Sequence, residues 1–242
     1  MKPIFNRLVK KLFNSIGLEV SISRASHSPA RTLLGLQALP IRSIIDVGAN
    51  SGQFARMISP KFPDAHIWCF EPLQEPFEQL SKWTDHVGKG RISVFNVALG
   101  EDEGTRQMWH HVDHSPSSSF LQTTHAGEEI YPLTKKQVSS HVHMTTLDGI
   151  VSELSAPLPP EILIKLDVQG YEERVIKGGI KTFRLSKACI VEICLDPIYE
   201  GQPTFKGIFQ SLHDLGYRYV GNLSQTLADD GHVIFLDAVF VK

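Results

Sequence analysis

The sequence predicts an α/β fold built on a doubly wound, mostly parallel sheet of seven strands. Three observations predict it. Short β-branched runs alternate with helical stretches from residue 43 onward, the first of these runs ends in a polar glycine loop, and the chain closes with two strand-like runs joined by Asp-Asp-Gly. The last two runs form a hairpin, which adds one antiparallel strand to the parallel sheet.

Each expected element follows from its local pattern. The strands are short and rich in Val, Ile, Phe and Cys, and the helices show three- and four-residue apolar spacing. In chain order the strands are residues 43–47, 66–71, 92–97, 163–168, 189–193, 218–221 and 233–242, and the helices are residues 53–61, 76–82, 172–177 and 205–215. A short helix at 32–39 leads into the first strand.

Composition indicates one enzyme-sized domain with a modest extension. The chain has 242 residues, of which 42% are hydrophobic and 21% charged, with a net charge of −2. We expect a domain at 41–242, preceded by an N-terminal amphipathic helix and linker at 1–40. Without a concentrated basic surface, nucleic-acid binding is not expected. Cys69, Cys189 and Cys194 lie in apolar runs without a C-x-x-C pair, which favours buried thiols in a reducing cytoplasm.

The N-terminal segment at residues 3–16 carries an apolar stripe opposite three cations, Arg7, Lys10 and Lys11. Two roles are open for this predicted helix. Its apolar face can pack on the domain or on a second subunit, which is the commoner use of such a stripe. Alternatively, the helix can lie on an anionic membrane surface, which would place the protein peripherally at the inner membrane and suit a lipid-linked substrate.

The first strand runs into a glycine loop of sequence Asp-Val-Gly-Ala-Asn-Ser-Gly, beginning at Asp46. Gly48 and Gly52 let the backbone approach a ligand closely, Asn50 lies between them, and Asp46 is expected at the strand end beside the ligand. The loop lacks the G-x-G-x-x-G spacing that serves a pyrophosphate. It therefore favours a ligand with a ribose and a base but no phosphates, of which S-adenosylmethionine is the common one.

Two further strand ends complete the expected cofactor site. Glu71 follows Asp46 by 25 positions, at the end of the second strand, where an acid in a βαβ nucleotide fold binds the ribose. Asn96 and Val97 end the third strand. The Asn96 amide could bond the edge of the adenine and Val97 could cover its face, and an Asn-capped turn is the alternative role for Asn96.

Four motifs together resemble the FkbM family of methyltransferases: the loop from Asp46 to Phe54, Phe-Glu-Pro around Glu71, Asn-Val-Ala-Leu-Gly from Asn96, and Lys-Leu-Asp-Val-Gln-Gly-Tyr-Glu from Lys165. The resemblance runs from about residue 41 to residue 242. It implies a Rossmann-like class I fold that uses S-adenosylmethionine and usually methylates oxygen, often on a sugar or polyketide hydroxyl. Many members carry Glu where this chain has Gln169.

The end of the fourth strand carries the expected chemistry. Asp167 lies at the strand tip, beside the cofactor, and Glu172 lies in the first turn of the next helix, so both carboxylates can face one cavity. An alcohol must lose its proton as the new bond forms, and Asp167 is the first candidate to orient or deprotonate it. For Glu172 three roles stay open, namely catalytic support, a divalent metal contact, and stabilisation of the helix N-terminus. Glu192 could reach the same rim.

A stretch of sequence Trp-His-His-Val-Asp-His ends at His114 and invites a metal interpretation. Without structural-zinc spacing we predict no metal site, and a divalent metal stays an alternative only. His114 is a further candidate for the base or for substrate contact, and serines 117–119 could bond the cofactor or a sugar. The polar, irregular stretch at 127–140 could form a lid over the acceptor.

Two other function classes are weighed against the methyltransferase. A short-chain-type NAD(P) oxidoreductase is suggested by Tyr131-x-x-x-Lys135, but Pro132 disfavours a helix that holds both residues. A binding protein that kept the fold but lost turnover is suggested by Gln169. The expected acceptor is a small-molecule or lipid-linked sugar, and the sequence specifies neither the hydroxyl nor the oligomeric state.

Overall fold

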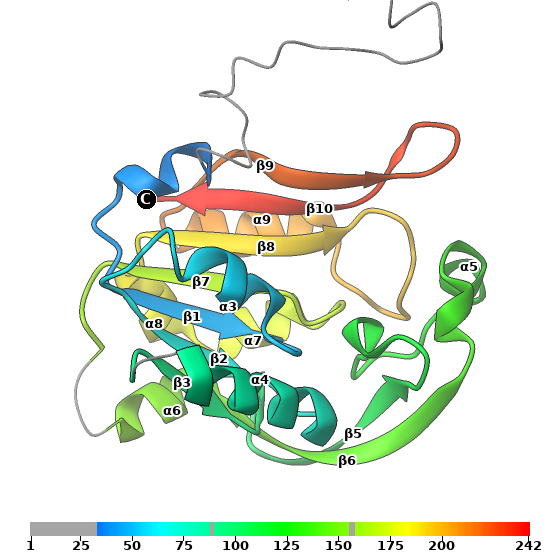
Figure 1. Ribbon diagram of the computed structural model, residues 1–242. Coiled ribbons are helices and arrows are strands. Elements are labelled where there is room, and N and C mark those ends of the chain that lie inside the picture. The colour runs from blue at the N-terminus through cyan, green and yellow to red at the C-terminus, as the bar shows by residue number, and fades with distance from the viewer. Residues whose placement is uncertain (1–32, 88–89, 155–157) are drawn as a thin grey trace, which may run out of the picture.

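The computed structural model describes residues 33–87, 90–154 and 158–242, and its centre is a seven-stranded sheet (Figure 1). The strand order is β3-β2-β1-β7-β8-β10-β9. The strands are β1 (Ser43–Val47), β2 (His66–Phe70), β3 (Ile92–Phe95), β7 (Ile162–Leu166), β8 (Ala188–Cys194), β9 (Arg218–Leu227) and β10 (Val233–Val241). Strand β10 runs antiparallel to both of its neighbours and the other pairs are parallel, so the predicted sheet with one antiparallel strand in a C-terminal hairpin is confirmed.

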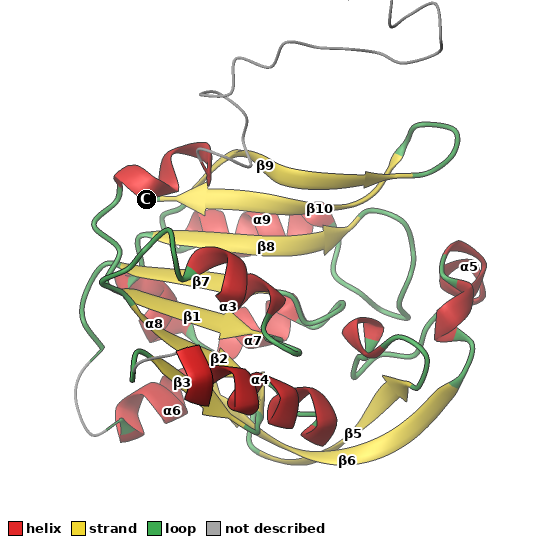
Figure 2. Cartoon of the chain, in the orientation of Figure 1, coloured by secondary structure: helices red, strands yellow, loops and turns green. Residues whose placement is uncertain are grey.

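Helices cover both faces of this sheet (Figure 2). On one face lie α3 (Gln53–Ile58) and α4 (Gln74–Val87). On the other lie α7 (Glu172–Gly178), α8 (Ile180–Leu185) and α9 (Phe205–Asp214), with α6 (Leu147–Glu153) beside α7 and α8. This double covering buries all five residues of β1 and of β7, which explains why both strands read as continuous apolar runs.

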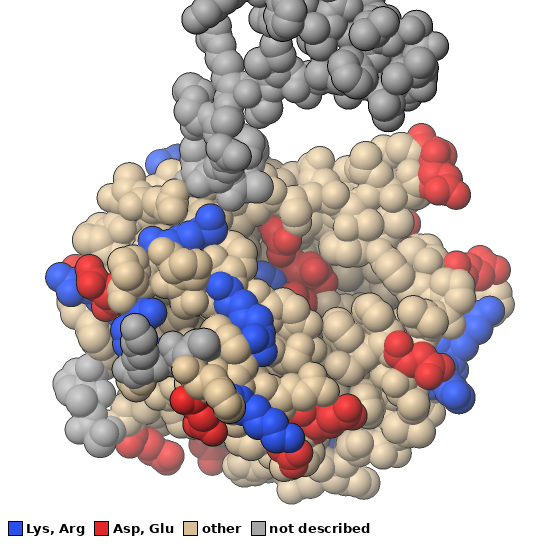
Figure 3. All heavy atoms as spheres, in the orientation of Figure 1, with Lys and Arg blue, Asp and Glu red and all other residues tan. Residues whose placement is uncertain are grey.

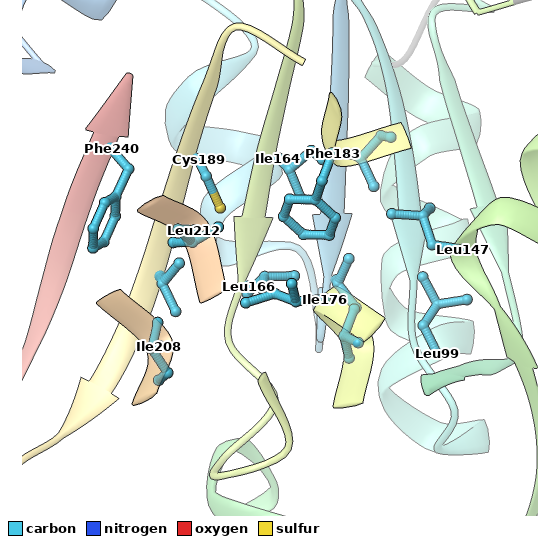
Figure 4. Packing of buried hydrophobic residues seen from close by; sticks show 14 of the residues in the cluster. Leu99, Leu147, Ile164, Leu166, Ile176, Phe183, Cys189, Ile208, Leu212 and Phe240 are labelled. Atoms are coloured by element: carbon cyan, nitrogen blue, oxygen red, sulfur yellow. The ribbon is translucent and has the colours of Figure 1, made fainter. Parts of the chain in front are cut away.

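The larger hydrophobic core lies between the sheet and helices α7 to α9 (Figure 4). Ile164 and Leu166 project from β7 against this helical layer, where Phe183 and Leu212 are fully buried, and Phe240 closes the cluster from β10. Each such side chain contributes about 1.5–3 kcal/mol when fully buried. The core therefore holds the carboxyl ends of β1 and β7 in a fixed relation, and the candidate site lies at these ends.

A second, three-stranded sheet was not predicted. It has the order β4-β6-β5 and is made of β4 (Ala98–Gly100), β5 (Gly104–His111) and β6 (Gln137–Thr146). The expected third strand at 92–97 was therefore too long, because the chain leaves the main sheet after Phe95 and re-enters a different sheet at Ala98. The long β5-β6 hairpin extends away from the main sheet (Figure 1).

The stretch expected to be an irregular lid at 127–140 contains regular structure. It includes most of α5 (His125–Ile130), the turn η3 (Pro132–Thr134) and the beginning of β6. The expectation of irregular chain was wrong here because one side of the hairpin faces solvent, so several residues of β6 are polar and exposed.

The expected short helix at 32–39 corresponds to the 3-10 turn η1 (Leu33–Ala38). Leu33 and Leu36 are buried in a second core cluster together with Ile44, so this end of the 1–40 segment packs on the domain. The amphipathic stretch at 3–16 lies outside the described residues. Within the described ranges, no helix has the length and apolar character needed to cross a membrane.

Candidate active site

The glycine loop after β1 is packed directly on the tip of β7. Gly48 has a φ of +78°, and a Cβ there would lie 1.9 Å from the carbonyl oxygen of Asp167. The amides of Gly48 and Ala49 both donate to the carbonyl of Phe70, at 3.0 Å each, so the loop is also tied to β2. Because only glycine fits this crossing, the sequence pattern fixes the loop against the residue that we expected to carry the chemistry.

Glu71 joins the glycine loop to the turn after β2. Its carboxylate accepts hydrogen bonds from the backbone amides of Asn50 and Leu73, each at 2.8 Å, and only 4% of the residue is exposed. Burial raises the pKa of Glu71 to about 7, although the two amide hydrogen bonds act in the opposite direction. Asn50, at a φ of +45°, also donates from its side-chain amide to Ser115 Oγ at 2.9 Å.

A hollow opens above the carboxyl ends of β1, β2 and β7. It combines a polar edge with a wide apolar wall, and it is lined by Gly48, Asn50, Phe70, Glu71, Pro72, Leu73, Val97, Ala98, Leu99, Met108, Ser115, Pro116, Ser118, Phe120, Asp167 and Val168. A carboxylate for ribose hydroxyls beside an apolar slot for a base suits a nucleoside without phosphates. The residues present therefore fit the expected cofactor, and we name this space the cofactor hollow.

Two residues expected to touch the cofactor do not line the hollow. Asp46 lies inside β1 and is 1% exposed, and its Oδ2 has no hydrogen-bond partner among the described residues. Burial is the main cause that raises the pKa of Asp46 to about 7, although Lys165 lowers it. Gly52 caps the start of α3 at a φ of +92°, where a Cβ would meet Leu80 at 2.6 Å. Both residues therefore support the glycine loop without facing the cofactor hollow.

Val97 and Asn96, which follow β3, have different roles. Val97 lines the cofactor hollow as expected. The Asn96 side-chain amide instead donates to the carbonyls of Glu71 and Pro72, at 3.0 and 3.1 Å. The structure thus uses Asn96 to hold the turn that carries Glu71.

Asp167 lies just beyond β7 and borders both the cofactor hollow and a second hollow beside it. Its carboxylate accepts from Lys165 Nζ at 3.1 Å and from Gln169 Nε2 at 2.7 Å, and 34% of the side chain is exposed. Lys165 is buried and also lies 3.5 Å from Asp237, and these carboxylates raise its pKa above the ordinary value despite its burial. Asp167 is therefore held in place by a buried cation.

Gln169, which the sequence analysis named only as a departure from the family pattern, lies at the centre of a hydrogen-bond network. It has a left-handed φ of +55°, and its amide nitrogen donates to Asp167 and also to Glu192, the latter at 2.6 Å. Its amide oxygen accepts from the Tyr199 hydroxyl at 2.5 Å, and its backbone carbonyl accepts from Ser119 Oγ at 2.6 Å. One sequence feature could have indicated this role. Gln169 follows Asp167 by two residues in a strand-to-helix turn, and this turn directs its side chain back toward Asp167.

We name the second hollow the acceptor hollow. Its lining is His114, Pro116, Ser117, Tyr131, Asp167, Gln169, Glu192, Cys194, Ile198, Tyr199 and Phe235. His114 is part of this lining and shares a 2.8 Å hydrogen bond with Ser117 Oγ. Figure 3 shows acidic side chains gathered beside the depression near the centre of the face in view.

Glu172 does not share this space. The sequence suggested that the carboxylates of Asp167 and Glu172 both face one cavity, but Glu172 is 3% exposed and lines neither hollow. Its Oε1 accepts from the backbone amides of Val168 and Gly170, at 3.3 and 3.1 Å. This geometry indicates a structural role that the sequence did not predict, closure of the turn that precedes α7.

Replacing Glu172 by glutamine tests that structural role. Burial raises the pKa of Glu172 from 4.5 to about 7, so the folded protein binds a proton that the unfolded chain releases, and the associated stability is lost as the pH rises from about 4.5 through 7. Glutamine keeps the accepting oxygen without the charge. We expect Glu172→Gln to raise the free energy of unfolding at pH 8 by on the order of 2 kcal/mol, to change it little at pH 5, and to leave turnover within about threefold. A large loss of turnover with unchanged stability would return Glu172 to a catalytic role.

The histidine stretch and the Tyr-x-x-x-Lys pair are dispersed by the fold. The His111 ring is fully buried and shares a 3.2 Å hydrogen bond with Thr123, whereas the His114 ring bonds Ser117. Among the residues that the structure describes, no group of three or more His, Cys, Asp or Glu side chains is arranged to hold a metal ion. Helix α5 ends at Ile130, so Tyr131 and Lys135 do not share a helical face, which the oxidoreductase alternative requires.

Comparison with known proteins identifies one matching family and several relatives of this chain. The sequence profile described as "Methyltransferase FkbM domain" matches residues 46–219. The chain is 29% identical over 195 residues to the 2-O-methyltransferase NoeI of Sinorhizobium fredii, covering 75% of each chain. It is 28% identical over 148 residues to the hexuronic acid methyltransferase AglP of Haloferax volcanii, covering 61% of this chain and 54% of the relative. The chain thus spans between about half and three quarters of these relatives.

A solved structure shares the fold. The methyltransferase FkbM from Methylobacillus flagellatus superimposes with a TM-score of 0.52 and 13% sequence identity, over 84% of this chain and 44% of the solved one. At this identity the likeness is one of fold alone. It confirms the Rossmann-like architecture that the strand order describes.

Proposed function

Because the chain belongs to the FkbM family of methyltransferases, we propose that it transfers a methyl group from S-adenosylmethionine to a sugar hydroxyl. Methyltransferase activity follows from the family, which also implies S-adenosylmethionine as the cofactor. The single observation that carries the proposal is the position of Asp167, which borders the cofactor hollow and the acceptor hollow at once. A carboxylate at that boundary can meet an acceptor group where it faces the cofactor.

We assign the cofactor to residues of the cofactor hollow. Glu71 and Asn50 would bond the ribose and its neighbouring polar groups, while Val97 and the other apolar side chains would cover the base. When bound, S-adenosylmethionine supplies an electrophilic methyl group on a sulfonium centre. Because Gly48 has no side chain, the loop can pass directly over the tip of β7 at the edge of the hollow.

Asp167 is assigned to the acceptor hydroxyl. Lys165 and Gln169 fix its two carboxylate oxygens, so it can accept a hydrogen bond from the hydroxyl and take its proton as the new bond forms. His114, on the opposite rim and bonded to Ser117, is the second candidate for the proton acceptor. The assignment needs no metal contact from Glu172, whose oxygen serves the backbone.

The sugar class rests on the relatives. NoeI is described as a 2-O-methyltransferase and AglP as a hexuronic acid methyltransferase. Calorimetric titration with S-adenosylmethionine, S-adenosylhomocysteine and NADPH tests the cofactor, with binding of the first two and none of NADPH expected. Mass spectrometry of glycans and glycolipids from a strain lacking the protein tests the acceptor. We expect one sugar to lack one methyl, and an unchanged glycan and lipid profile would contradict the sugar assignment.

The segment at 1–40 is proposed to be an extension that precedes the methyltransferase domain at 41–242. For residues 3–16 the membrane role is testable with vesicles, because clustered Lys and Arg residues bind anionic lipids and salt screens the attraction. If the membrane role holds, the full chain binds anionic vesicles at low salt, and high salt or Lys10→Glu with Lys11→Glu releases it. Lys135→Glu with Lys136→Glu, at two exposed lysines outside this segment, is the matched control. Full chain that ignores the vesicles would assign the segment to packing on protein, and a lipid-linked acceptor would lose its support.

A further inference from the structure

The acidic residues among the described lining of the acceptor hollow are Asp167 and Glu192, and its one histidine is His114. No Lys or Arg in the described part of the chain contributes to this lining. A sugar that carries a carboxylate or phosphate would therefore meet acceptor oxygens without a cation to pair with.

The nearest buried cation is already neutralised. Lys165 Nζ lies 3.1 Å from Asp167 and 3.5 Å from Asp237, and only 7% of its side chain is exposed. It lies behind Asp167, on the side of the sheet where β10 supplies Asp237, and does not line the acceptor hollow. The pair of carboxylates around one ammonium leaves no positive charge for an anionic ligand.

The protein's own side chains already show that this space disfavours negative charge. Burial and the neighbouring Asp167 raise the pKa of Glu192 well above its usual range, and burial and Glu192 raise that of Tyr131. A ligand carboxylate brought to the same place would lose its hydration and meet the same neighbours. Anionic acceptors therefore face a double penalty here.

The remaining lining suits an uncharged sugar. Tyr131, Tyr199 and Phe235 give the hollow aromatic surfaces for the C–H faces of a pyranose ring. The carboxylates of Asp167 and Glu192 and the Ser117 segment supply acceptors for several hydroxyl protons. Hydroxyls can donate to all of these groups, whereas a carboxylate or phosphate has no proton to donate at neutral pH.

We propose that the acceptor is an uncharged hexose or deoxyhexose unit, and that Asp167 and Glu192 together exclude uronic acids and sugar phosphates. This inference rests on the proposed sugar methylation and narrows it. It also separates this chain from AglP, the relative whose printed description names hexuronic acid. Glu192 thereby becomes a specificity-determining residue, held in place by Gln169 at 2.6 Å.

The test compares sugar acceptors that carry a negative charge with acceptors that do not. Transfer of labelled methyl from S-adenosylmethionine is measured for p-nitrophenyl glycosides of a hexose, a 6-deoxyhexose, a hexuronic acid and the methyl ester of that hexuronic acid. The ester and the free acid share one skeleton. We expect the ester to exceed the acid in kcat/KM by at least tenfold at low salt, with the ratio falling as salt screens the repulsion.

An acid preferred to its ester, or equal to it, would overturn the inference while leaving sugar methylation intact. If no glycoside of the panel accepts a methyl while S-adenosylmethionine still binds, the sugar assignment itself fails and this inference falls with it. The two failures are therefore distinguishable by whether any sugar is methylated.

A variant arm assigns the effect to charge. Phe235→Arg adds a cation to the lining of the acceptor hollow, and Leu227→Arg adds the same charge on the neighbouring strand at a side chain that is exposed and lines no part of it. We expect Phe235→Arg to lower the ester-to-acid ratio at least fivefold and Leu227→Arg to preserve it. An equal ratio in the wild type and Phe235→Arg would contradict a charge-based exclusion. If Phe235→Arg is inactive on both acceptors, the wild-type ratio decides alone.

Discussion

Replacing Asp167 by asparagine is expected to lower kcat by about 10²–10⁴-fold while S-adenosylmethionine still binds. Asparagine keeps the size of the side chain and one accepting oxygen, but it cannot take the proton of an alcohol. Its amide nitrogen would also face either Lys165 Nζ or Gln169 Nε2, both of which donate to Asp167 in the structure. The measurement is turnover of a sugar acceptor beside calorimetric cofactor affinity.

Asp237→Asn is the matched control for this substitution. Asp237 is the other carboxylate partner of Lys165, at 3.5 Å, and it lines neither the cofactor hollow nor the acceptor hollow. The same loss of one charge beside the same ammonium should cost less than tenfold in kcat. Near-normal turnover in Asp167→Asn would move the base elsewhere, and His114→Gln would be the next variant to measure.

Replacing Gly48 by alanine is expected to weaken binding of S-adenosylmethionine by at least about 100-fold, which corresponds to about 2.7 kcal/mol. The φ of +78° costs an L-residue about 1–2 kcal/mol, and the new Cβ would lie 1.9 Å from the Asp167 carbonyl oxygen. Because that oxygen is backbone, either the glycine loop or the tip of β7 must shift. In either case one border of the cofactor hollow moves.

Gly201→Ala separates conformational strain from this collision. Gly201 has a similar φ of +71°, but a Cβ there meets nothing within 4 Å. We expect Gly201→Ala to lose about 1–2 kcal/mol of unfolding free energy and to keep its cofactor affinity. Titration of both variants, after circular dichroism has verified their fold, gives the comparison. Unchanged affinity in a folded Gly48→Ala variant would remove the basis for placing the cofactor at this loop.

The main sheet was predictable because its signals are local. Strands β1 and β7 are buried on both faces, and β8 is so except at one residue, so each is a short, mostly apolar run that ends in a polar loop. The β5-β6 hairpin has no such run, since its residues alternate between partly buried and exposed positions and include several histidines and serines. The hairpin pairs residues that are far apart in the chain, such as Gly104 and Met144, so a short window of sequence does not predict the pairing.

The candidate site was predictable where backbone chemistry dictates residue type. A glycine at position 48 and acids at 71 and 167 follow from the positive φ, the loop amides and the strand ends. The sequence alone could not separate Asp167 from Glu172, because both are acids around one turn. Their difference arises from the direction of the side chains, since one faces the hollows and the other accepts from the backbone amides of its own turn.

Gln169 illustrates what depends on tertiary structure. Its side-chain amide bonds Glu192 and Tyr199, which lie 23 and 30 residues later in the chain. Only the fold brings β8 and the segment after it beside the turn that follows β7. In the sequence the residue differs from a family pattern, and in the structure it links the proposed base to the wall of the acceptor hollow.

The most direct test of the account is a single reaction in solution. The purified full chain is incubated with methyl-labelled S-adenosylmethionine and glycans isolated from a strain that lacks it, and the products are analysed by NMR and mass spectrometry. The account predicts that one label appears as an O-methyl group on an uncharged sugar, and that Asp167→Asn forms this product at least about 100-fold more slowly. Label found on nitrogen or carbon, or an equal rate in Asp167→Asn, would contradict it.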